Sequence, residues 1–235
     1  MPSLWSWLFI FLLIGVVPYL SARSLRAAGT SSLSRTELYA SACFSLWLLA
    51  AVGYLVIRID GDTAADVYLT RGTAGASWMA LPMASLLLAA AGLLVFALSH
   101  IAHHALRLPM EEAMLRRLRP SNLSESLWIL LAVSPTAGFC EEFLYRGFLI
   151  SRLAPLLSSW NLAAILSAAA FGAAHLYQGW AGALRAALIA LILSLPVIYY
   201  GSLIPSIIAH ALIDAVGILC LWPLLERSWP RAAAE

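Results

Sequence analysis

Long apolar runs separated by short polar segments dominate this 235-residue sequence. Seven runs approach the roughly 20 apolar residues that one helical crossing of a bilayer needs. They lie at residues 4–20, 38–57, 78–98, 127–150, 162–177, 183–200 and 203–222. Pro135 lies within the fourth run and predicts a break there, because proline removes a backbone donor and disfavours helix just before it. The pattern predicts an all-α, polytopic integral membrane protein with seven to eight transmembrane helices.

Composition supports a membrane protein and excludes an ordinary soluble domain. The chain is 62% hydrophobic and 11% charged, against about 45 to 50% and about 25% in soluble proteins. All 14 basic residues are arginine, which indicates a GC-rich genome and favours the inner (plasma) membrane of a bacterium. Basic residues do not alternate with aromatic ones outside the apolar runs, so no nucleic-acid partner is expected.

The distribution of arginine predicts an orientation and a division of the chain. Arginines gather in the loops after the first and third runs, and the positive-inside rule places those loops in the cytoplasm. We expect N-terminal transmembrane helices and a cytoplasmic connector over residues 1–125, a catalytic membrane domain over 126–222, and a polar tail over 223–235.

Charged residues interrupt the fourth apolar run. Glu141, Glu142 and Arg146 lie within it, and each charged residue at a helix centre costs roughly 2.5 to 3.5 kcal/mol on insertion scales, or about 7 to 10 kcal/mol for the three. On an α-helix Glu142 and Arg146 share a face. We therefore interpret them as a neutralised structural ion pair, which leaves Glu141 free for chemistry.

Later runs carry further polar residues at helical spacing. His210 and Asp214 are four residues apart, as are Phe171 and His175. Two histidines and one or two carboxylates from three helices could hold a water molecule, either directly or through a metal ion. The alternative is that these buried polar groups only join helices, as such groups do in membranes.

These motifs, taken together and in this order, resemble those of a known family. Glu-Glu-x-x-x-Arg (Glu141, Glu142, Arg146), Phe-x-x-x-His (Phe171, His175) and His-x-x-x-Asp (His210, Asp214) are similar to the motifs of the CPBP family. That family contains type II CAAX prenyl endopeptidases and Abi-like bacterial proteins for bacteriocin processing and immunity. The resemblance covers about a third of the chain.

The resemblance implies a CAAX-protease-like helical bundle and an intramembrane endopeptidase. Glu141 would activate water as general base, His175 and His210 would shape the water and oxyanion site, and Asp214 would support His210. The third motif of the family often ends in Asn, whereas this chain has Asp214. The added negative charge leaves open whether a divalent metal such as zinc is required; its ligands would be His175, His210, Glu141 and Asp214.

Three functions remain open from the sequence. The first is hydrolysis of a peptide bond in a membrane-associated peptide or protein by glutamate-activated water. The second is a non-catalytic bacteriocin-immunity or partner-binding membrane protein that keeps the polar core for helix packing. The third is a proton-coupled transporter, against which the short chain and the absence of an evident sequence repeat argue.

Overall fold

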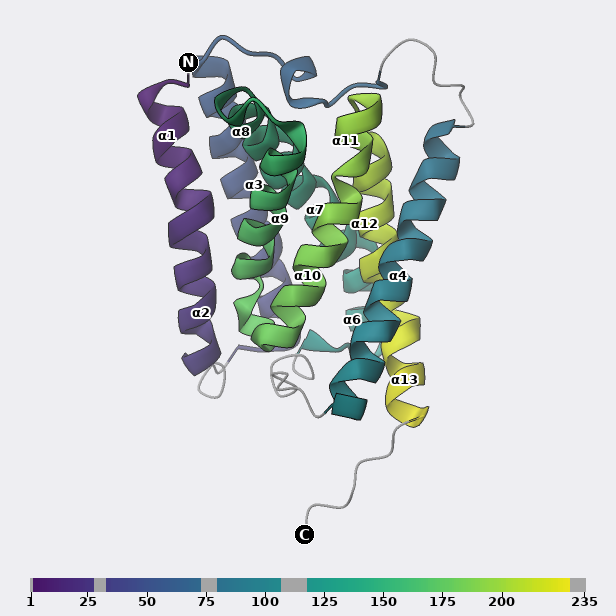
Figure 1. Ribbon diagram of the computed structural model, residues 1–235. Helices are drawn as coiled ribbons and strands as arrows, with labels where there is room; N and C mark the ends of the chain where they lie inside the picture. The colour runs from purple at the N-terminus through teal and green to yellow at the C-terminus, as the bar shows by residue number, and fades with distance from the viewer. Residues whose placement is uncertain (1, 28–32, 73–79, 107–117, 229–235) are drawn as a thin grey trace.

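The protein is a bundle of helices that stand side by side (Figure 1). The computed structural model describes residues 2–27, 33–72, 80–106 and 118–228, and within these ranges every regular element is a helix. The α-helices are α1 (Leu4–Phe11), α2 (Val17–Ala27), α3 (Arg35–Ile59), α4 (Ala80–Leu106), α6 (Leu123–Trp128), α7 (Ser134–Glu141), α8 (Ile150–Leu157), α9 (Trp160–Ala174), α10 (Gly179–Leu193), α11 (Leu195–Tyr200), α12 (Ile204–Val216) and α13 (Trp222–Ser228). Short π- and 3₁₀-helices join several of them: η1 (Leu12–Val16), η2 (Ala65–Val67), η3 (Ile129–Val133), η4 (Glu142–Leu149), η5 (Leu176–Gln178) and η6 (Gly217–Leu221).

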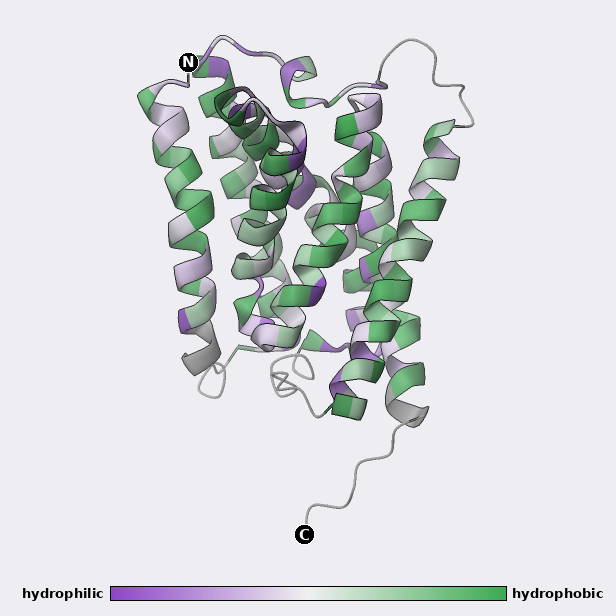
Figure 2. Cartoon of the chain, in the orientation of Figure 1, coloured by the Kyte–Doolittle hydropathy of each residue, from purple (hydrophilic) through white to green (hydrophobic). Residues whose placement is uncertain are grey.

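Hydrophobic residues predominate along the helices of the bundle (Figure 2). Large hydrophobic residues such as Phe44, Leu87 and Leu131 are exposed, as expected where lipid rather than water is the solvent. In the most apolar parts of Arg35–Ile59 and Ala80–His103, 22% of the residues are buried inside the protein. In those of Leu123–Leu157 and Leu176–Tyr200, the buried share is 50%. The C-terminal half therefore forms the centre of this integral membrane protein.

The prediction of seven to eight spans was too high. In the described part of the chain, six helical stretches are long and apolar enough to cross a membrane. The predicted fifth span corresponds to α9, which has 15 residues and is too short. Its first turn is capped by Ser159, whose side chain accepts a hydrogen bond from the Leu162 amide, and it ends at His175. Its apolar run arises instead from burial among other helices.

The predicted break at Pro135 was also wrong. Helix continues from Leu123 to Leu157 over 35 residues, passing through Pro135. The π-helical stretch η3 ends two residues before the proline, and such wider turns accommodate the missing donor and the bulk of the ring. The long helix therefore carries Glu141 and Glu142 without interruption.

Two glycines allow the central helices to approach closely. A Cβ at Gly172 of α9 would lie 2.7 Å from the Ala183 carbonyl oxygen of α10. A Cβ at Gly138 of α7 would lie 2.8 Å from the Ile207 carbonyl oxygen of α12. Both distances are shorter than a real Cβ contact, so glycine sets the spacing of these helix pairs. The α7–α12 contact lies about one turn from Glu141.

The two ends of the bundle carry different helix termini. The C-terminal ends of α2, α4 and α13 lie at one end, and α8 and α11 reach the other (Figure 1). Arg35 begins α3 at the first end and forms a 3.9 Å ion pair with Glu125 of α6. Residues 107–117, which include much of the predicted connector, and residues 229–235 of the predicted tail lie outside the described ranges.

Candidate active site

The long helix places the glutamate pair at the start of π-helical segment η4. Glu142 is fully buried, and its Oε1 lies 3.2 Å from Nη1 of Arg146, which is 1% exposed. The predicted ion pair is therefore present. The Arg146 guanidinium also lies 4.4 Å from the centre of the Phe171 ring, which adds a cation–π contact. Glu142 and Arg146 thus neutralise each other inside the protein, and Phe171 supports the arginine.

The same segment ties α9 to the long helix. A backbone carbonyl has two lone pairs, so a carbonyl of this segment can accept a bond from a neighbouring helix. The Tyr145 carbonyl accepts a 2.6 Å hydrogen bond from the fully buried Ser167 hydroxyl of α9. Tyr145 also packs edge-on against Phe171, with ring centres 5.1 Å apart. These contacts fix the part of α9 that ends at His175.

His210 of α12 stands between three carboxylates. Its Nδ1 lies 2.7 Å from Glu142 Oε1, a hydrogen bond in which the imidazole donates to the carboxylate. Its Nε2 lies 3.6 Å from Glu141 Oε2 and 3.7 Å from Asp214 Oδ2. Both of these distances exceed a hydrogen bond, and a separation beyond about 3.5 Å is one that a water molecule can bridge.

The contact between Glu142 and His210 was not found by sequence reasoning. We expected Asp214 to orient His210, but Glu142 makes the 2.7 Å hydrogen bond and Asp214 lies 3.7 Å from the other ring nitrogen. No spacing within one helix could reveal this, because the contact depends on the approach of α7 to α12 at Gly138.

His175 lies at the C-terminal end of α9, where its backbone leaves the helix. Its Nδ1 is 2.9 Å from the Phe171 carbonyl oxygen. A carbonyl can only accept, so Nδ1 carries the hydrogen and Nε2 is the nitrogen that remains for other partners. The ring packs against Phe171 at 4.4 Å and Tyr177 at 5.6 Å between centres. Both neighbours restrict the orientation of this imidazole.

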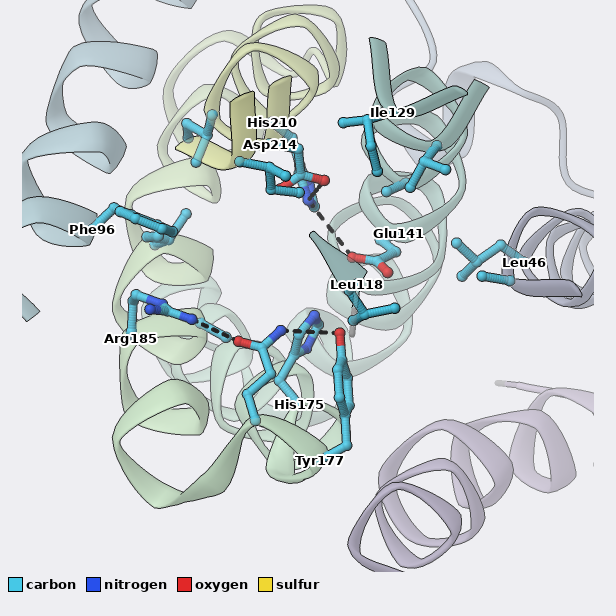
Figure 3. A pocket seen from close by; sticks show the side chains of 18 of the residues that line it. Leu46, Phe96, Leu118, Ile129, Glu141, His175, Tyr177, Arg185, His210 and Asp214 are labelled. Carbon is cyan, nitrogen blue, oxygen red and sulfur yellow. Dashed lines mark hydrogen bonds and ion pairs between the residues drawn. The ribbon is translucent and has the colours of Figure 1, made fainter. Parts of the chain in front are cut away.

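A cavity of about 240 Å³ brings the predicted site residues together (Figure 3). Glu141, His175, His210 and Asp214, which come from three different helical segments, all line it. Most of the remaining wall is apolar, with Phe96, Ile129 and Ile189 among its residues. A small, mainly apolar cavity with a few convergent polar groups is the usual form of a binding or catalytic site.

The cavity also contains polar residues that sequence reasoning missed. Tyr177, Gln178 and Arg185 line the cavity, and Figure 3 shows Tyr177 and Arg185 on the same side as His175 and across from His210. Arg185 Nη2 donates a 2.7 Å hydrogen bond to Gln178 Oε1, and Gln178 Nε2 donates a 2.9 Å bond to the Tyr177 hydroxyl. Arg185 is a charged residue inside an apolar span, and the rule that singled out Glu141 could have singled it out too.

The arrangement does not fit the metal site considered from the sequence. Among the described residues, no three His, Cys, Asp or Glu side chains are placed to hold one ion. The Nδ1 atoms of His175 and His210 are bonded to Phe171 and Glu142, so Nε2 of each ring is the only nitrogen that could bind a metal ion, and these atoms do not converge with a third ligand in the described part of the chain. We therefore derive no catalytic step through a metal.

Comparison with known proteins identified one family. Residues 123–216 match the family model described as type II CAAX prenyl endopeptidase Rce1-like. Neither the curated proteins nor the solved structures gave a match. The matched segment runs from α6 to the end of α12 and includes all seven residues of the three motifs. This match confirms the resemblance to the CPBP family over residues 123–216.

Proposed function

We propose that this protein is an intramembrane endopeptidase that hydrolyses a peptide bond in a membrane-associated peptide or protein. The observation that carries the proposal is the different surroundings of the two adjacent glutamates. Glu142 is fully buried and held by Arg146 and His210. Glu141 lines the cavity with its Oε2 3.6 Å from His210 Nε2. Only Glu141 is therefore free to act on a bound water.

The reaction follows from these positions. A water molecule between Glu141 and His210 gives a proton to the Glu141 carboxylate while its oxygen forms a bond to the scissile carbonyl carbon. His210, protonated on both ring nitrogens, donates from Nε2 to the oxyanion and is held in place by its Nδ1–H bond to Glu142. Nε2 of His175, whose Nδ1 donates to the Phe171 carbonyl, accepts a hydrogen bond from the attacking water. Glu141 then returns its proton to the leaving amine as the carbon–nitrogen bond breaks. Atoms and charge balance without a cofactor.

Asp214 has a separate part in this scheme. Its Oδ2 lies 3.7 Å from His210 Nε2, on the side of the ring that Glu141 also faces. A carboxylate there favours the protonated imidazole and accepts a hydrogen bond from the same water. Asp214 therefore helps to position water, whereas Glu142 orients the ring.

The position of the cavity supports access from the arginine-rich end. Leu38 and Tyr39, in the first turns of α3, line the cavity together with Leu118. By the positive-inside rule this end faces the cytoplasm, which supports a location in a bacterial inner membrane. The catalytic domain then spans residues 126–222, after N-terminal helices and a connector over 1–125 and before a tail over 223–235.

Cleavage by a Glu141→Gln variant tests the proposal. The full chain is purified in detergent and incubated with short acetylated peptides of randomised sequence, and products are detected by mass spectrometry. We expect wild type to cleave and Glu141→Gln to lose about 10²- to 10⁴-fold in rate, since the amide cannot accept the proton. Glu125→Gln makes the same change elsewhere in the long helix and should retain activity.

Equal rates for wild type and Glu141→Gln would overturn the proposal and favour the non-catalytic alternative. In that case the buried polar residues only hold the helices together. Arg146→Ala would then disrupt folding, whereas Glu141→Gln would change neither folding nor function. Cleavage by wild type is also measured with and without a chelator. We expect the same rate in both, because the proposed reaction has no metal-dependent step.

A further inference from the structure

Arg185 of α10 is a buried cation in the wall of the cavity. Its side chain is 8% exposed, and the guanidinium lies 4.7 Å from the centre of the Phe96 ring of α4. One donor, on Nη2, is used in the 2.7 Å hydrogen bond to Gln178. A guanidinium has five N–H donors in a planar fork, so most of its donors are not accounted for by this bond.

The charge of Arg185 distinguishes it from the two other arginines in the protein interior. Arg146 forms an ion pair with Glu142, and Arg152 forms ion pairs with Asp60 and Asp62. Arg185 takes part in none of the ion pairs between described residues. Its partner is a neutral amide. Charged groups in protein interiors are normally paired. Arg185 interacts with the charge of Asp214 only at longer range, and it lacks the direct anionic partner that the other two have.

The position of Arg185 shows where such an anion would lie. Arg185, with Gln178 bonded to it, lines the cavity, and Figure 3 shows Arg185 on one side of the cavity with His210 and Asp214 across from it. Glu141 lies between them on a third side. An anionic group bound to Arg185 would therefore belong to the same molecule whose peptide bond is presented to Glu141.

We infer that Arg185 binds a carboxylate of the substrate and so determines which peptides enter the site. The inference rests on the proposed peptidase function. The two oxygens of a carboxylate match the guanidinium fork, while Gln178 and Phe96 hold the fork in place. The carboxylate belongs either to the C-terminus of the peptide or to an acidic side chain near the scissile bond. The cavity is smaller than the roughly 300 to 1,000 Å³ of common ligand sites. Only a short part of the peptide therefore separates the carboxylate bound to Arg185 from the scissile bond at Glu141.

Peptide pools distinguish these two sources. Acetylated peptides of randomised sequence are prepared with free C-terminal carboxylates, with C-terminal amides, and with or without Asp and Glu at the randomised positions. Cleavage of each pool by the full-length protein in detergent is followed by mass spectrometry. We expect wild type to prefer one carboxylate-bearing pool over its amide or uncharged counterpart by about 10- to 100-fold, mainly in KM.

Substitution of Arg185 should remove this preference. Arg185→Gln should cleave the two matched pools equally, at the rate at which wild type cleaves the uncharged one, and Arg185→Lys should keep part of the preference because it keeps the charge without the fork. Arg152→Gln removes an interior arginine at the other end of the molecule and should leave the preference intact. A melting curve for each variant shows that it is folded.

Binding separates this inference from the proposed function. The Glu141→Gln protein and the Glu141→Gln/Arg185→Gln protein are compared for retention of the same pools on immobilised protein. If wild type cleaves nothing but the carboxylate pool is still retained through Arg185, the peptidase proposal fails and the carboxylate site stands. If wild type shows no carboxylate preference, or if Arg185→Gln weakens every pool to the same extent, Arg185 supports the cavity only and the inference is wrong.

Discussion

Two clusters in this protein each combine one interior arginine with acidic residues, yet they are built differently. Arg152 Nη2 lies 3.2 Å from Asp60 Oδ2 and also contacts Asp62, and the Ser6 hydroxyl donates a 2.6 Å bond to Asp60. This cluster joins α1, the end of α3 and α8. Its charges are close to one another, and we interpret it as a structural connection between helices.

The cluster around His210 is open by comparison. Glu142 is engaged by Arg146 and His210, but Glu141 and Asp214 stand 3.6 and 3.7 Å from His210 Nε2. These gaps lie against a cavity rather than against packed side chains. Buried charge alone therefore does not indicate a functional site, because both clusters contain it. A functional site is indicated where charged groups lack a direct hydrogen-bonded partner and border a cavity that water and substrate can occupy.

Removal of His210 should break the open cluster most severely. We expect His210→Gln to lose about 10²- to 10⁴-fold in cleavage rate, because it loses both the polarised Nε2 and the bond to Glu142. The double variant with Glu141→Gln should be little worse than either single variant, since both residues act on one water. Additive losses in the measured kcat values would show that the two residues act independently.

Removal of Arg146 should have the next largest effect, on stability. Arg146→Met leaves the fully buried Glu142 without its cation, and breaking a buried ion pair in this way costs about 3 to 5 kcal/mol. Denaturant unfolding in detergent measures the change. The double variant Glu142→Gln/Arg146→Met should be more stable than Arg146→Met, because no unpaired charge remains. If the double variant is the less stable one, the pair is not the reason for the loss.

The approach of α7 to α12 can be tested with a single methyl group. Gly138→Ala places a Cβ 2.8 Å from the Ile207 carbonyl oxygen, so the helices must move apart at a cost of about 1 to 3 kcal/mol. That movement also lengthens the Glu142–His210 contact and should lower the cleavage rate. Gly217→Ala is the matched control, since its Cβ meets nothing nearer than 3.6 Å. Equal melting temperatures for the two variants would contradict the close-approach argument.

The cluster of Arg152, Asp60 and Asp62 should show the smallest effect, and only at acid pH. Burial alone would raise the pKa of Asp60, but hydrogen bonds from Ser3 and Ser6 and the charge of Arg152 outweigh it and lower the pKa below 3.8. A lowered folded-state pKa gives stability that is complete above the ordinary pKa and is lost as the pH falls through the folded-state value.

Melting temperature as a function of pH measures this contribution. We expect wild type to lose about 1 kcal/mol more than Asp60→Asn as the pH falls below about 4. The cleavage rate of folded Asp60→Asn at neutral pH should match wild type, since Asp60 lies outside the cavity. Parallel pH curves for the two proteins would show that this carboxylate does not contribute.

The sequence alone specified the membrane class and most of the helices, and it predicted several of the polar residues that line the cavity. Apolar length specifies a spanning helix because each backbone polar group must be satisfied within lipid. The spacing of Glu142 and Arg146 specified their ion pair, because residues four apart share one helix face. Charged residues inside apolar runs pointed to Glu141, His210 and Asp214, which the structure brings to one cavity.

Tertiary structure decided the rest, because the deciding contacts join residues far apart in the chain. Apolar length could not show that α9 is a short interior helix, since burial against protein and burial in lipid select the same residues. Nor could it show that a π-helical turn carries the long helix past Pro135. The bond from His210 to Glu142, and the place of Arg185 in the cavity wall, arise only where the long helix, α10 and α12 meet.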